Sequence, residues 1–562
     1  MKRRRLPLML GFVVGVMSVV SLLPAIASAQ VVERWVARYS GPTGVFPGPA
    51  DDKACCIARD PTSGHVYVTG HSYGGIGYGG PATGDDYATV AYDANGIQLW
   101  VARYDRTTRV CPPPHWCGGN ERPTAIAVDP HSGTVYVTGY SSSGGPLANP
   151  EYATVAYDAL GNQLWVARYD GRHDGSAHAA TASAIAVDPN SGTVYVTGSS
   201  YGGTATSYDY ATVAYDASGD QLWVARYDGP GHSDDRAWAI AVDPNSGAVY
   251  VTGESYPGGY ATVAYDAGGN QLWVARYEGP VGIDYVHGIA LDPTSGNVYV
   301  TGQSSRGAAT GADYATVAYD ACGNQLWVAR YGDGSAHAIA LDPASGNVYV
   351  TGSSYGGAAT RSDYATVAYD ACGNQRWVAR YDGAGDSDGA NAIALDPTSG
   401  NLYVTGISYT RATGYDYATV AYDASGRQLW VARHHGGPTG YETNAVAIAV
   451  GSGDVYVTGY DYGREGGGTT SYATVAYSTS EMVDSPEVSP MGEPQEVRRP
   501  RCHACCSNGS GSSDETTSET ARAIRWCGRM YKRLLKIESR KDAQHQVDLD
   551  EVLTGEVEQP QP

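Results

Sequence analysis

An acidic residue stands immediately before the recurring segment YATVAY in six of its eight copies. Carboxylates gathered on one face can hold a cation or accept hydrogen bonds from sugar hydroxyls. Each can equally accept backbone N–H groups within its own loop, as Asp does in turns. Repetition favours this second interpretation, because a ligand site usually breaks the symmetry of a repeat. The six candidate ligand-face residues are Asp86, Glu151, Asp209, Asp313, Asp363 and Asp416.

An arginine occupies the same place in all eight copies of a second segment, WVARY or WVARH. In an extended strand, Trp and Ala fall on one face while Val and Arg fall on the other. The segment AYD supplies an acid, such as Asp216, at the end of the neighbouring strand in seven copies. We therefore expect an inter-strand ion pair with that acid rather than a ligand-binding arginine. The arginines are Arg38, Arg103, Arg168, Arg226, Arg276, Arg330, Arg380 and Arg433.

Motifs of common metal and phosphate sites do not occur. The sequence contains no H-E-x-x-H and no P-loop, and it predicts no catalytic, cofactor-binding or metal-binding residues. Near the C-terminus, RCHACC (residues 501–506) has enough ligands for zinc, but its spacing matches no known zinc finger, and disulfides are the alternative. Cys111 and Cys117, which bracket CPPPHWC, are the predicted disulfide.

Four short segments that recur eight times must position these residues. They are WVARY, AIAVD, VYVTG and YATVAY, each rich in Val, Tyr, Trp or Thr and bounded by turn residues, which is typical of strands. Turns joining AIAVD to VYVTG and YATVAY to WVARY are short and nearly invariant, whereas the other two connections vary in length. In an antiparallel meander, alternate connections lie at the same end. Both variable loops therefore share one face, where we expect binding to occur.

Repeats of this size predict an all-β fold, an eight-bladed β-propeller of four-stranded antiparallel blades. A β-solenoid is the alternative, but the hairpin signals within each repeat count against it. The small apolar AIAVD segment suits the crowded centre, and WVARY suits the rim. On this phasing, residues 34–39 form a lone outer strand that pairs with the C-terminal strands and closes a ring spanning residues 31–477.

The two ends differ from the repeats. Residues 1–29 have a basic start, an apolar run and an A-x-A site, which predict a signal peptide cleaved after Ala29 and a secreted or cell-surface protein; a membrane anchor is the alternative. No later segment is long and apolar enough to span a membrane. Residues 478–518 are expected to be a flexible linker, 519–541 a basic amphipathic helix, and 542–562 a disordered acidic end. The net charge of −21 argues against nucleic acid as a partner.

The pattern D-x-x-G-N-x-x-W, then AIAVD, then GNVYVTG resembles the bacterial SBBP-type β-propeller repeat family. Residues 266–273 and 289–302 are one such stretch, and the resemblance covers roughly 31–477. It implies an exported or cell-surface propeller and brings no catalytic residues. A second resemblance is to the tryptophan-docking motif of quinoprotein dehydrogenases, which are also eight-bladed. Ala214 to Trp223 is similar but one residue shorter, and the vicinal pair Cys55 and Cys56 is similar to their cysteine pair.

These features predict a monomeric, non-catalytic binding or scaffold module without a cofactor. It would contact a protein or glycan partner through the Tyr-, Gly-, Ser- and Asp-rich loops of the variable face. The alternative is a quinoprotein-like oxidoreductase or a polysaccharide-active enzyme.

Overall fold

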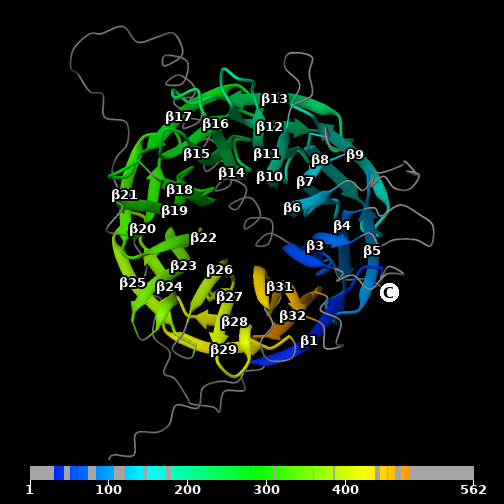
Figure 1. Cartoon of the computed structure of the whole chain (residues 1–562), viewed down its shortest axis with the longest axis vertical. Coiled ribbons are helices and arrows are strands. Elements are labelled where there is room, and N and C mark those ends of the chain that lie inside the picture. The colour runs from blue at the N-terminus through cyan, green and yellow to red at the C-terminus, as the bar shows by residue number, and fades with distance from the viewer. Residues whose placement is uncertain are drawn as a thin grey trace, which may run out of the picture.

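Each recurring segment forms a strand, because its β-branched and aromatic side chains pack on a pleated surface and its flanking Gly, Asn and Asp residues make tight turns. In the computed structural model, 32 strands form eight antiparallel sheets of four, arranged as a ring (Figure 1). The predicted eight-bladed β-propeller is therefore confirmed. The structure describes residues 31–42, 51–73, 84–106, 120–142, 149–171, 179–282, 284–307, 311–358, 360–383, 387–436, 443–451, 453–462 and 470–479.

Several predicted features lie outside the described residues. They are the signal peptide, the pair Cys111 and Cys117, the RCHACC segment, the amphipathic helix, the acidic end and nearly all of the linker. Within the described residues, no helix is long and apolar enough to cross a membrane.

Every blade runs from the axis of the ring to its rim. Blades 1 to 8 begin with the inner strands β2 Lys53–Arg59, β6 Glu121–Val128, β10 Ala180–Val187, β14 Asp235–Val242, β18 Asp284–Leu291, β22 Gly334–Asp342, β26 Asp388–Leu395 and β30 Asn444–Gly451. The second strands are β3 Val66–Tyr73, β7 Val135–Ser141, β11 Val194–Tyr201, β15 Val249–Ser255, β19 Val298–Gly307, β23 Asn347–Gly357, β27 Leu402–Thr410 and β31 Asp454–Tyr462.

The third strands are β4 Asp85–Tyr92, β8 Glu151–Tyr157, β12 Tyr208–Tyr215, β16 Tyr260–Tyr265, β20 Gly311–Tyr319, β24 Arg361–Tyr369, β28 Gly414–Tyr422 and β32 Thr470–Ser478. The outer strands are β5 Gln98–Tyr104, β9 Gln163–Tyr169, β13 Gln221–Tyr227, β17 Gln271–Tyr277, β21 Gln325–Tyr331, β25 Gln375–Tyr381, β29 Gln428–His434 and, for blade 8, β1 Val32–Tyr39. We call the end with the short turns the constant face and the end with the longer loops the variable face.

Blade 8 closes the ring with strands from opposite parts of the chain. Its strand order is β1-β32-β31-β30, and β1 pairs antiparallel with β32, with Val36 opposite Val475 and Arg38 opposite Ala473. The predicted closure is confirmed, and it leaves no unpaired blade edge facing a gap in the ring.

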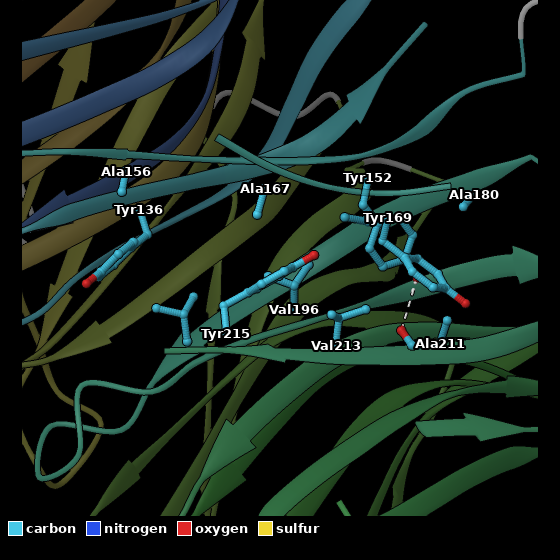
Figure 2. Packing of buried hydrophobic residues seen from close by; sticks show 12 residues of the cluster. Tyr136, Tyr152, Ala156, Ala167, Tyr169, Ala180, Val196, Ala211, Val213 and Tyr215 are labelled. Carbon is cyan, nitrogen blue, oxygen red and sulfur yellow. Dashed lines mark hydrogen bonds between the residues drawn. The ribbon is translucent and has the colours of Figure 1, made fainter. Parts of the chain in front are cut away.

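The core lies between neighbouring blades. Between blades 2 and 3, Tyr136 and Tyr152 of one blade pack against Val196, Ala211 and Val213 of the next (Figure 2). The Tyr152 hydroxyl donates a hydrogen bond of 3.0 Å to the Ala211 carbonyl, so its buried polar group is paired. Large tyrosines against small Ala and Val residues explain why YATVAY and VYVTG recur with so little change.

Outer-strand tryptophans join neighbouring blades on the constant face. Trp223 Nε1 donates to the Ala267 carbonyl at 3.0 Å, and its ring covers Gly269, where an added Cβ would lie 2.6 Å from Trp223 Cδ2. Gly269 also has φ +82°, a conformation that favours glycine. Seven interfaces repeat this contact: Trp35 on Gly96, Trp100 on Gly161, Trp165 on Gly219, Trp223 on Gly269, Trp273 on Gly323, Trp327 on Gly373 and Trp377 on Gly426.

Candidate functional site

The six predicted ligand-face acids are buried rather than displayed on the surface. Each is paired with the arginine of the following outer strand, as Asp209 is with Arg226 at 2.7 Å. The pairs are Asp86 with Arg103, Glu151 with Arg168, Asp209 with Arg226, Asp313 with Arg330, Asp363 with Arg380 and Asp416 with Arg433. The predicted inter-strand ion pair therefore exists, but the partner predicted for the arginine is wrong.

Strand register explains the error. Arg226 lies opposite Ala211, two residues after Asp209 and on the same face of β12. Asp216 of AYD lies five residues beyond Ala211, about 16 Å away at roughly 3.3 Å per residue. Asp216 Oδ1 instead accepts the backbone N–H groups of Ser218 and Asp220, which closes the constant turn.

The arginines also join each blade to the one before it. Arg226 Nη1 donates to Tyr169 Oη of blade 2 and to Ser200 Oγ of its own blade, both at 2.9 Å. We call the seven equivalent contacts the arginine belt: Arg103 to Tyr39, Arg168 to Tyr104, Arg226 to Tyr169, Arg276 to Tyr227, Arg330 to Tyr277, Arg380 to Tyr331 and Arg433 to Tyr381. A guanidinium with so many protein partners holds blades together.

Blades 4 and 8 lack the acidic residue before YATVAY, and their arginines have different partners. In blade 8, Ser471 replaces it, and Asp461 on the neighbouring strand β31 accepts the bond from Arg38 at 2.9 Å. In blade 4, Gly259 replaces it, and Arg276 is left with Ser255 and Tyr227. Its nearest carboxylate is Glu278, 3.8 Å away and largely exposed.

A second set of buried acids, not predicted from the sequence, stands at the start of the inner strands. Its members are Asp52, Glu121, Asp235, Asp284 and Asp388. Four of them accept a backbone N–H from a glycine shortly after the preceding outer strand, as Asp235 Oδ2 does from Gly229 at 2.7 Å. Burial raises the pKa of Asp52, Asp235 and Asp388 above the usual value. The sequence signal would have been an acid five residues before the isoleucine of the inner strand, as Asp235 is before Ile240.

Between blades 1 and 2, acids of both sets come together. One carboxylate oxygen each from Asp86, Asp105 and Glu121 lies within 4.8 Å of the others. Burial raises the pKa of Asp86 to about 6, and burial with the nearby Asp105 and Asp86 charges raises the pKa of Glu121 to about 8. Within the described residues, this is the only group of three acidic, His or Cys side chains so placed.

The inner strands carry a β-bulge near the variable face. In β14 the pairing with β15 shifts between Ala237 and Ala239, so Trp238 has no opposite residue. The bulge residues are Cys55, Thr124, Ser183, Trp238, His287, His337, Asn391 and Val446. A bulge bends its strand and redirects a side chain. These eight residues are of seven different types, with His in both blades 5 and 6, although Ala flanks most of them.

Two further variable positions lie near each bulge, and we call these three positions of all eight blades the axial rim. One is two residues before the bulge: Lys53, Arg122, Thr181, Arg236, Tyr285, Ser335, Gly389 and Asn444. The other lies on the second strand, opposite the position two residues before the bulge: His71, Tyr140, Ser199, Glu254, Gln303, Ser353, Ile407 and Tyr460. All of these inner-strand ends meet around the axis of the ring (Figure 1).

Some axial-rim side chains form hydrogen bonds with the neighbouring blade, and others are exposed to solvent. His337 Nδ1 lies 2.7 Å from the Ala390 carbonyl, and Asn391 Nδ2 donates to the Ala445 carbonyl at 2.7 Å. Trp238 and Tyr285 instead expose 45% and 44% of their surface. Burial, with His337 nearby, lowers the pKa of His287 to about 4, so this imidazole is neutral near pH 7.

The two sequence features that resemble those of quinoprotein dehydrogenases have local structural roles. The tryptophan of the similar motif, Trp223, packs on the glycine turn of the next blade. Cys55 and Cys56 form a vicinal disulfide at the bulge of β2. Neither observation favours a cofactor-binding role over blade packing.

No family model and no curated protein matches the chain. A solved structure described as the Dos1 propeller is similar with a TM-score of 0.47 and 10% identity, covering 78% of this chain and 96% of its own. A eukaryotic initiation factor gives a TM-score of 0.35 and 10% identity, covering 70% and 90%. The assignment as an eight-bladed β-propeller therefore rests on this chain's own sheet topology.

Proposed function

We propose that the chain is an exported, non-catalytic binding or scaffold protein that takes a protein or glycan partner on the axial rim of its variable face. The proposal rests on the positions at which the residues of the eight blades differ. Elsewhere in the blades, most side chains recur and make similar contacts around the ring, and such a surface offers nearly equivalent positions to a partner. At the axial rim, no two blades carry the same three residues, and such variation suits a single asymmetric partner.

On the axial rim, blades 4 and 5 carry the exposed aromatic and charged side chains best suited to bind a partner. Trp238 and Tyr285 expose nearly half of their residue surface, and Arg236 and Glu254 lie opposite each other in the β14–β15 pair. Arg236 also lies over the ring of Tyr208, 4.9 Å from its centroid. Tyr, Trp and Arg dominate binding energy at protein interfaces, and exposed aromatic faces also cover the apolar faces of sugar rings.

The sequence supports the remaining parts of the proposal. A leader with an A-x-A site supports export, and the recurrence of the SBBP-type pattern along the repeats supports membership of that family. The acidic composition supports a partner other than nucleic acid.

A glycan array with the purified full chain tests the proposal. We expect binding confined to one sugar class, lost in Trp238→Ala and kept in Leu160→Ala. Leu160 is the matched control, because it exposes 77% of its surface in a constant-face turn. If no sugar binds, a photo-crosslinking residue at position 238 should capture a discrete protein that one at position 160 does not. Loss of binding in Leu160→Ala but not in Trp238→Ala would contradict the proposal.

A further inference from the structure

Cys55 and Cys56 form a disulfide between adjacent residues of the inner strand β2. A disulfide stabilises a fold mainly by closing a loop in the unfolded chain, and the effect grows with the length of that loop. The bond between Cys55 and Cys56 closes no such loop and joins no two elements, because both residues belong to one strand. Cross-linking therefore does not account for this disulfide, and its surroundings indicate another role.

The two sulfurs lie against the inner strand of blade 2. Cys55 Sγ is 3.4 Å from the carbonyl oxygen of Pro123, and Cys56 Sγ is 3.1 Å from the carbonyl oxygen of Thr124. A thiol is a weak hydrogen-bond donor and can donate to a carbonyl at these distances. A disulfide sulfur carries no hydrogen and cannot donate. The oxidation state of the pair therefore decides whether blade 1 donates hydrogen bonds to blade 2 at this contact.

In three other blades the same contact contains a donor. The bulge residue of each donates to the carbonyl of the residue that precedes the bulge in the next blade, which is the relation of Cys55 to Pro123. Blade 1 matches these blades only when Cys55 is a thiol. The three contacts are Thr124 Oγ1 to Ala182 at 3.0 Å, His337 Nδ1 to Ala390 at 2.7 Å and Asn391 Nδ2 to Ala445 at 2.7 Å.

We propose that Cys55 and Cys56 are a redox centre that a dithiol reductant converts from a disulfide to two thiols. A thiolate of the reductant attacks one sulfur and breaks the S–S bond, and its second thiol then resolves the mixed disulfide. Two electrons and two protons pass to the cysteines, and the dithiol becomes a disulfide. Both cysteines are partly accessible to solvent, so a small dithiol reaches them in the folded ring. The two thiols then donate to the carbonyls of Pro123 and Thr124.

Thiol labelling of the full chain, purified without reductant, tests the redox centre. The native protein is treated with dithiothreitol, alkylated with iodoacetamide and digested with trypsin, which releases residues 54–59, ACCIAR, for mass spectrometry. We expect no label before reduction, both cysteines labelled after it, and none again after treatment with oxidised dithiothreitol. Reduction should be at most about ten-fold slower in the folded chain than in urea, because the pair is accessible.

Two double variants test the hydrogen bonds to blade 2. Cys55→Ser with Cys56→Ser supplies hydroxyl donors that no reductant changes, and Cys55→Ala with Cys56→Ala supplies none. The alanine variant also reports any effect of dithiothreitol on the other cysteines of the chain. We expect dithiothreitol to raise the melting temperature of wild type by about 1–2 °C relative to its effect on the alanine variant. The serine variant should melt above the alanine variant with and without reductant.

Two labels on the protein purified without reductant, or labelling only after unfolding in urea, would overturn the redox centre. Because this measurement needs only wild type, it holds even if a variant fails to fold. An equal response of wild type and the alanine variant to dithiothreitol would overturn the role given to the two thiols.

Discussion

Replacing Arg226 by Met should destabilise the ring far more than the same change at Arg276. Both arginines bind a tyrosine of the preceding blade and a serine of their own. Arg226 also forms an ion pair with a buried acid, Asp209, whose side chain is 6% exposed, whereas the carboxylate that pairs with Arg276 is the largely exposed Glu278. In blade 4 glycine stands at the acid's position, so Arg276 is a natural control.

The expected magnitudes follow from what each substitution leaves behind. Arg226→Met leaves the Asp209 carboxylate buried without its cation, which costs about 3–5 kcal/mol of unfolding free energy. Arg276→Met leaves a hydroxyl and a phenol that can rebind water, at a cost of about 1–1.5 kcal/mol. We therefore expect a difference of at least about 2 kcal/mol between the two variants.

Urea unfolding followed by tryptophan fluorescence measures this difference, because the outer-strand tryptophans report on the blade interfaces. Asp209 can escape its unpaired charge by protonation, so the deficit of Arg226→Met should shrink at pH 4.5 relative to pH 8, whereas that of Arg276→Met should not. Equal losses in the two variants at pH 8, or a loss in Arg226→Met that does not depend on pH, would refute the role given to the ion pair.

Three further predictions concern closure, blade packing and pH. Deleting residues 30–40 removes β1 and exposes the edge of β32, so the melting temperature should fall strongly; an unchanged melt would contradict ring closure. Gly269→Ala should lower the melting temperature because it forces an L-residue to φ +82° and against Trp223, whereas Gly268→Ala, with ordinary φ, should change it little. Burial raises the Asp235 pKa above 3.8, so its contribution to stability is full below that pH and is lost as pH rises through the folded-state pKa. Asp235→Asn should therefore flatten the fall in melting temperature between pH 4 and pH 8, and an unchanged slope would show that another group causes it.

The fold could be predicted from the sequence because local and global signals agree. YATVAY and VYVTG alternate with turn residues eight times, and the constancy of two connections set the faces and the strand order within a blade. The lone strand before the first complete repeat predicted that the ring closes by pairing the two ends of the repeat region, and the pairing of β1 with β32 confirms this.

The ion-pair partner was mispredicted because two acids recur beside YATVAY, one at each end. Choosing between Asp209 and Asp216 requires the register of β12 with β13, where Arg226 lies opposite Ala211. Counting back from the turn that follows Asp216 would have placed Arg226 near Asp209.

The axial rim and the second set of acids were missed for a different reason. Both depend on the bulge in the inner strand, which shifts the side-chain alternation by one residue and turns Trp238 out of the β14–β15 pairing. Nothing in AWAIAV marks that shift, and the acids stand next to loops of variable length. The buried contact between Asp235 and Gly229 therefore appears only when the blades are assembled.

Transplanting the axial rim of blade 3 into blade 4 tests the proposed binding surface most directly. The triple variant Arg236→Thr, Trp238→Ser and Glu254→Ser carries the residues that blade 3 already holds at positions 181, 183 and 199. It should therefore fold. The measurement is its affinity for the sugar class or protein that wild type binds. A melting temperature near that of wild type with at least ten-fold weaker binding is the predicted result, and wild-type affinity in the folded variant would contradict the account.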